Sequence, residues 1–74
     1  MSQLEEQKAK VKKLSARAMQ LKMDLHDLSE ELPQNWQVIP ALAVKTHDAF
    51  AELEQARAEL KELKDAAETA AETA

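Results

Sequence analysis

Apolar residues recur at alternating intervals of three and four along the first part of the chain. Two series that each repeat every seven residues carry this pattern: Leu4, Val11, Ala18, Leu25 and Leu32, and Gln7, Leu14, Leu21 and Leu28. Such an a/d pattern, with one polar interruption at Gln7, is typical of a helix that packs along a coiled-coil seam. We therefore predict a helix over about residues 3–32.

The ends of this helix and a second helix can also be placed from the sequence. The stretch "SQLE" at Ser2–Glu5 has the spacing of a capping box, and Pro33 cannot continue a helix. Beyond it, a second pair of heptad series follows: Ile39, Thr46, Leu53, Leu60 and Ala67, and Leu42, Ala49, Ala56, Leu63 and Ala70. We predict a turn over residues 33–39, a second helix over about 40–70 and a fraying tail at 71–74.

The two seams match if the helices fold back on each other. Opposing seam residues then have position numbers with a constant sum. A sum of 74 pairs apolar residues at most levels, including Ala18 with Ala56 and Leu21 with Leu53, and pairs Leu28 with Thr46. On the flanking positions this register pairs mostly opposite charges. The sequence thus predicts a single domain, residues 1–74, that forms an antiparallel two-helix hairpin.

The predicted turn, "LPQNWQVIP", must reverse the chain without glycine. Asn35 is suited to a tight turn, and Pro40 fits the first turn of a helix, where its missing N–H is not needed. Trp36 is then expected to cover the end of the hairpin core, since a tryptophan near a turn usually packs.

Other apolar residues lie outside the seam and call for a separate explanation. The large ones are Met19, Met23, Val44 and Phe50. In an antiparallel pair they fall on one flank, which would be an exposed apolar patch in a monomer. We expect an all-α fold in which hairpins associate into a four-helix bundle, as a homo-oligomer (dimer or tetramer). An open surface for another protein is the alternative.

Length and composition favour association for a second reason. A chain of 74 residues without cysteine has neither a large core nor disulfides to stabilise it. No apolar run is long enough to cross a membrane, so we expect a soluble, cytoplasmic protein. Residues 1–22 carry a net charge of +4 and residues 23–74 carry −8. The hairpin lays these regions side by side, so we expect internal neutralisation and no nucleic-acid binding, although a basic helix face is one way to bind RNA.

Two histidines are the candidate metal ligands. His26 and Glu30 have the i,i+4 spacing that places two ligands on one helix face, and the register brings His47 to a similar height. These three residues would hold a divalent transition metal, so a metal or metallocluster carrier that uses His26 is the alternative function. There is no nucleophile–base arrangement and no glycine-rich phosphate loop, so we do not expect an enzyme.

Several motifs resemble one small family. They are "KMDLHDL" at residues 22–28, "LP" with a tryptophan three residues after the proline, and "IP" followed by "KTHDAF". The sequence is similar in these motifs to the Rop-like family encoded in nitrogen-fixation gene clusters. The resemblance implies a two-helix hairpin that associates into bundles. The gene neighbourhood of the family implies a part in nitrogenase assembly or in metal handling, so we expect an accessory or adaptor with a nitrogenase-assembly protein as a partner.

Overall fold

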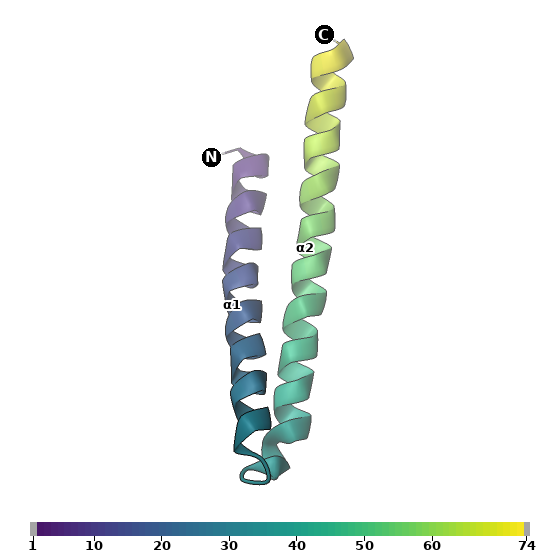
Figure 1. Cartoon of the computed structure of the whole chain (residues 1–74). Coiled ribbons are helices and arrows are strands. Elements are labelled where there is room, and N and C mark those ends of the chain that lie inside the picture. Colours follow the sequence, from purple (N-terminus) through teal and green to yellow (C-terminus); the bar gives the residue numbers. More distant parts are fainter. Residues whose placement is uncertain (1, 74) are drawn as a thin grey trace.

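The chain forms two long antiparallel helices joined by a short connection (Figure 1). The computed structural model describes the backbone of residues 2–73 and the side chains of residues 2–67. Helix α1 spans Gln3–Glu31, a 3₁₀ turn η1 spans Trp36–Val38, and helix α2 spans Ile39–Thr73. The predicted all-α hairpin is confirmed. The molecule is a rod of 61 × 17 × 15 Å.

Helix α1 begins as its sequence predicts. Ser2 is the N-cap, and its side-chain oxygen accepts a hydrogen bond of 3.1 Å from the backbone N–H of Glu5. Glu5 and Glu6 lie in the first turn, where negative charge interacts favourably with the helix dipole. The start of the first helix is therefore fixed by local sequence.

The connection between the two α-helices has the predicted length but lies one residue earlier, over residues 32–38. Leu32 leaves the helical conformation directly before Pro33, and Asn35 adopts the left-handed conformation with φ of 62°. Asparagine tolerates this conformation better than most residues, which explains how the chain turns without glycine. Helical winding then resumes at Trp36, whereas the prediction placed the second helix start at Pro40. At the other end α2 continues through Thr73, past the predicted end at residue 70, and Ala74 lies outside the described residues.

The register of the hairpin also differs from the prediction, by one heptad. Ala18 packs with Ala49 and Leu53, and the side-chain amide of Gln7 donates a hydrogen bond of 2.9 Å to the Ala56 carbonyl. The position numbers of Ala18 and Ala49 sum to 67, so the predicted sum of 74 is wrong. A heptad pattern determines this sum only to within multiples of seven, because a shift by seven again pairs a with d positions. The early start of helical winding at Trp36 selects the smaller sum, and α2 therefore extends beyond the N-terminal end of α1 (Figure 1).

Charges beside the seam agree with the observed register. It places three pairs of oppositely charged residues across from one another: Lys10 and Glu59, Arg17 and Glu52, and Asp24 and Lys45. Lys10, Glu52 and Glu59 line one shallow hollow between the helices. The predicted register instead placed Asp24 opposite Glu52, two like charges. The flanking charges thus discriminate between registers that the apolar pattern leaves equivalent.

Gln7, the polar interruption of the seam, has defined partners. Its half-buried side-chain amide donates to the Ala56 carbonyl and, at 3.2 Å, to a carboxylate oxygen of Glu59. A partly buried polar group favours the register in which it has hydrogen-bond partners over a register in which it has none. Gln7 is therefore a second local determinant of the pairing.

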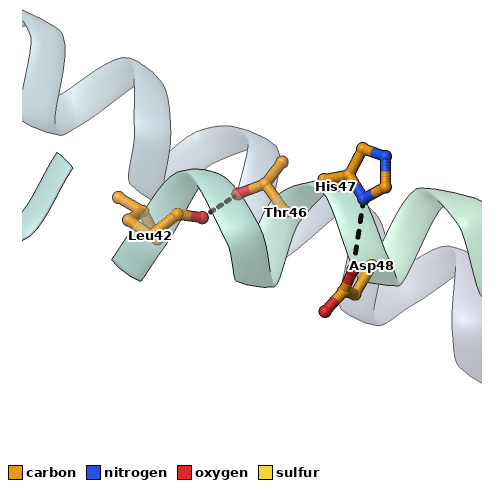
Figure 2. A network of polar contacts seen from close by, with 4 residues as sticks. All are labelled: Leu42, Thr46, His47 and Asp48. Atoms are coloured by element: carbon orange, nitrogen blue, oxygen red, sulfur yellow. Dashed lines mark hydrogen bonds and ion pairs between the residues drawn. The ribbon is translucent and has the colours of Figure 1, made fainter. Parts of the chain in front are cut away.

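The core of the single hairpin is thin. Its buried residues are Ala18, Leu28, Thr46, Ala49, Leu53 and Ala56. The hydroxyl of Thr46 donates a hydrogen bond of 2.8 Å to the Leu42 carbonyl one turn earlier, so this buried polar group is satisfied (Figure 2). Alanines allow the helices to approach closely, but they bury little apolar area.

A pair of cysteine variants tests the register. The chain has no cysteine, so the double variant Ala18→Cys, Ala49→Cys is expected to form an intramolecular disulfide on mild oxidation, because these residues pack together. The matched variant Ala18→Cys, Ala56→Cys is expected to remain reduced within the chain. Non-reducing electrophoresis and mass spectrometry distinguish the two variants. A disulfide that forms preferentially between positions 18 and 56 would support the predicted register, with a sum of 74.

Candidate interaction surface

Four large apolar side chains outside the seam are exposed on the two helices. They are Met19, Met23, Val44 and Phe50, with exposed fractions of 52%, 54%, 59% and 38%. We call this set the apolar flank. Met19 and Met23 come from α1, and Val44 and Phe50 come from α2, so the flank spans both helices. The hairpin leaves uncovered the residues that the sequence predicted as a self-association or partner surface.

Part of the seam itself is also uncovered. Leu25, Leu32 and Ile39 lie at seam positions, yet they are 36%, 40% and 37% exposed. Two helices can bury a seam from one side only, so the other side stays open to solvent unless further helices cover it. The open seam and the apolar flank together leave much of the chain's large apolar surface in water.

Trp36 does not cover the end of the core. Its exposed fraction is 60%, so the prediction that it acts as a lid is wrong for the single hairpin. Trp36 is the first residue of the 3₁₀ turn and lies outside the α1–α2 seam.

The candidate metal ligands fall into two separate pairs. The Nε2 atom of His26 lies 3.1 Å from a Glu30 carboxylate oxygen, as the i,i+4 spacing predicted. The Nδ1 atom of His47 lies 3.1 Å from Asp48, its neighbour in sequence (Figure 2). In the observed register, the position across from His26 is about six residues before His47, which is roughly 9 Å along the helix axis. The predicted similar height of the two histidines is therefore wrong.

The described residues contain no group of three histidine, cysteine or acidic side chains arranged to hold a metal ion. His26, Glu30 and His47 are thus not brought together in one chain, and a complete site would need ligands from a second copy. Within the described part of the chain, neither helix has a stretch apolar enough to cross a membrane.

The fold and its uncovered surface define a class: small antiparallel helical hairpins with apolar residues left exposed on one flank. Comparison with known proteins identifies the family within this class. The profile of the Rop-like family matches residues 2–65, and the chain belongs to that family.

Relatives support the same assignment. A UPF0437 protein of Azorhizobium caulinodans is 56% identical over 63 residues, which cover 85% of this chain and 91% of the relative. A relative from Frankia alni, described as a UPF0437 protein in the nifX-nifW intergenic region, is 46% identical over 44 residues, or 60% of this chain and 54% of the relative. A protein solved by NMR is 47% identical with a TM-score of 0.79, covering 86% of this chain and 90% of that protein. The predicted resemblance to the Rop-like family of nitrogen-fixation gene clusters is confirmed.

Proposed function

We propose that this protein is a non-catalytic, oligomeric accessory or adaptor protein associated with nitrogen fixation. The observation that carries the proposal is the uncovered apolar surface of the hairpin, formed by the apolar flank together with Leu25 of the open seam. Support for the nitrogen-fixation context comes from the position of the Frankia alni relative, between nifX and nifW. The adaptor would act by binding, first to copies of itself and then to a protein of nitrogenase assembly.

The size of the exposed surface supports association. The chain exposes 5882 Å², whereas a compact monomer of 8.3 kDa exposes roughly 4,600 Å². Its radius of gyration is 17.2 Å, against about 11 Å for a compact domain of this length. The excess of about 1,300 Å² exceeds the ~800 Å² that each partner contributes to a standard interface. One hairpin therefore has more than enough surface for a stable interface with a second copy.

A four-helix bundle is the arrangement that would cover this surface most directly. Pairing two hairpins through the flank would cover Met19 and Phe50 and would close the open side of the seam at Leu25. Such a bundle gives each helix two neighbours, which turns the thin core of the single hairpin into a full one. Dimers and tetramers are both compatible with the lengths of the helices.

The partner is tested by purification from nitrogen-fixing cells. We expect the tagged protein to retain a nitrogenase-assembly protein when the host fixes nitrogen. The matched preparation comes from cells grown on ammonium, where little of that partner is made. Recovery of the same proteins in equal amounts from both preparations would argue against a role specific to nitrogen fixation.

A metal carrier is the second candidate, and the observation that favours it is the His26–Glu30 pair. The Nε2 atom of His26 and a Glu30 carboxylate oxygen lie 3.1 Å apart, so one chain would offer a metal ion two ligands from one helix. We expect calorimetric titration with nickel, copper, zinc or iron ions to give no saturable binding. Saturable binding that disappears in His26→Ala, and persists in the control His47→Ala, would favour the carrier instead.

A further inference from the structure

The turn end of the hairpin carries a second group of exposed apolar side chains, separate from the apolar flank. Its members are Leu32, Trp36, Val38 and Ile39, with exposed fractions of 40%, 60%, 47% and 37%. We call them the turn cluster. They lie at the end of α1, in η1 and at the start of α2, all at the end of the rod where the chain reverses (Figure 1).

The turn cluster lies in a part of the sequence that has acidic residues and no lysine or arginine. From Asp24 to Val44 there is no lysine or arginine, while Asp24, Asp27, Glu30 and Glu31 are acidic. The whole chain has 14 acidic and 10 basic residues. Lys45 follows this segment directly and lies across from Asp24 in the hairpin, so the turn end beyond that pair carries Asp27, Glu30 and Glu31, a net charge of −3.

Two of these carboxylates, Glu30 and Glu31, lie at the C-terminal end of α1. The C-terminal end of a helix is the negative end of its dipole, where basic residues are stabilising and acidic ones are not. The last turn of α1 contains no basic residue and ends in Glu30 and Glu31. Glu31 is held beside the turn, because the side-chain amide of Asn35 donates a hydrogen bond of 3.4 Å to its carboxylate. Glu30 and Glu31 thus lie directly before the turn cluster in the chain, at a helix end where negative charge is unfavourable.

We propose that the turn cluster is the docking site for a basic segment of a partner protein. Apolar side chains of that segment would cover Trp36 and Leu32, and its lysine or arginine side chains would neutralise Glu30 and Glu31. Tryptophan is among the residues that contribute most to protein interfaces when it becomes buried at their centre. Nucleic acids and anionic lipid surfaces carry the same sign of charge as this end of the molecule, which disfavours both. The proposal rests on the adaptor function. It identifies the surface through which the adaptor binds and the kind of partner segment, basic and partly apolar, that it binds.

The single tryptophan of the chain provides the readout. The probes are two synthetic amphipathic helical peptides with the same leucine face, one with a lysine polar face and one with a glutamate polar face. We expect the lysine peptide to shift the emission of Trp36 to shorter wavelengths in a saturable way, with an affinity that falls as salt is added. The glutamate peptide is expected to leave the emission unchanged, and equal binding of both would overturn the proposal.

Charge variants then locate the site. Glu30→Gln with Glu31→Gln is expected to weaken binding of the lysine peptide about tenfold, since it removes the two carboxylates at the end of α1, directly before the turn cluster. The control Glu52→Gln with Glu54→Gln changes the net charge equally but lies along α2, away from the turn, and is expected to change the affinity less than twofold. Equal losses in the two variants would mean general attraction to an acidic protein and would overturn the proposal.

The oligomeric state separates this proposal from the proposed function. Trp36→Ala is expected to keep the molar mass of the wild type in light scattering, because the turn cluster is a site for another protein. A lower mass would show that the turn cluster is a contact between copies of the chain and would overturn the proposal. If the wild type is a monomer and the lysine peptide still binds at Trp36, the oligomeric part of the proposed function fails while the docking site stands.

Discussion

The double variant Met23→Glu, Phe50→Glu is expected to lose the oligomeric state of the wild type. Both side chains belong to the apolar flank and come from different helices. In a bundle formed through this flank, two carboxylates would be buried without partners, which is strongly unfavourable. Because the stability of an oligomer is coupled to its association, the apparent free energy of unfolding should fall by about 3 kcal/mol or more at micromolar concentration. Size-exclusion chromatography with light scattering and thermal unfolding measure the two effects.

The matched control for that experiment is Gln20→Glu with Gln55→Glu. It adds the same two negative charges at exposed positions on the two helices, outside the apolar flank. We expect it to keep the oligomeric mass and to change the melting temperature by a few degrees at most. If the flank variant keeps its mass but no longer retains a partner, the flank is a surface for another protein. If it loses neither, the apolar flank has no role in binding.

Leu53→Ala is expected to have the second-largest effect, on folding itself. Leu53 is 4% exposed, and it packs with Ala18 and Ala49 in the centre of the hairpin. Removing a buried leucine side chain costs about 3 kcal/mol through lost burial and the cavity that remains. A chain with so few buried large residues has little stability to lose, so the variant should be largely unfolded at temperatures where the wild type is folded. Circular dichroism during heating or urea titration measures this change.

The control Leu53→Met replaces the leucine side chain without removing its volume. Methionine has a similar volume and adapts its shape, so the free energy of unfolding should fall by less than about 1.5 kcal/mol. A Leu53→Ala variant as stable as Leu53→Met would mean that Leu53 is not the centre of the core. The hairpin would then be stabilised by contacts other than those around Ala18 and Ala49.

The fold followed from the sequence because its determinants are local. The heptad spacing, the Ser2 cap and the break at Pro33 each act within a few residues, and the structure confirms each of them. The register did not follow, because the apolar pattern repeats every seven residues and so gives equivalent pairings at each shift. Charge pairing beside the seam held the missing information: Asp24 opposite Lys45 is favourable, whereas Asp24 opposite Glu52 is not.

The exposed apolar surface was predictable in part, because the heptad pattern shows which apolar residues lie outside the seam. Met19, Met23, Val44 and Phe50 stood outside the seam, and the hairpin leaves them exposed as expected. Trp36 was misplaced, because its environment depends on where helical winding resumes after the turn, and a heptad pattern does not report that position. The acidic surroundings of the turn were visible in the sequence, but their meaning depended on finding Trp36 exposed among them.

Self-association of the hairpin is tested most directly by the molar mass of the wild-type chain in light scattering over a range of concentrations. We expect at least twice the mass of one chain at micromolar concentration, with dissociation and loss of helix together on dilution. A particle of one chain mass that keeps its full helix content, and unfolds at the same temperature at every concentration, would contradict the account.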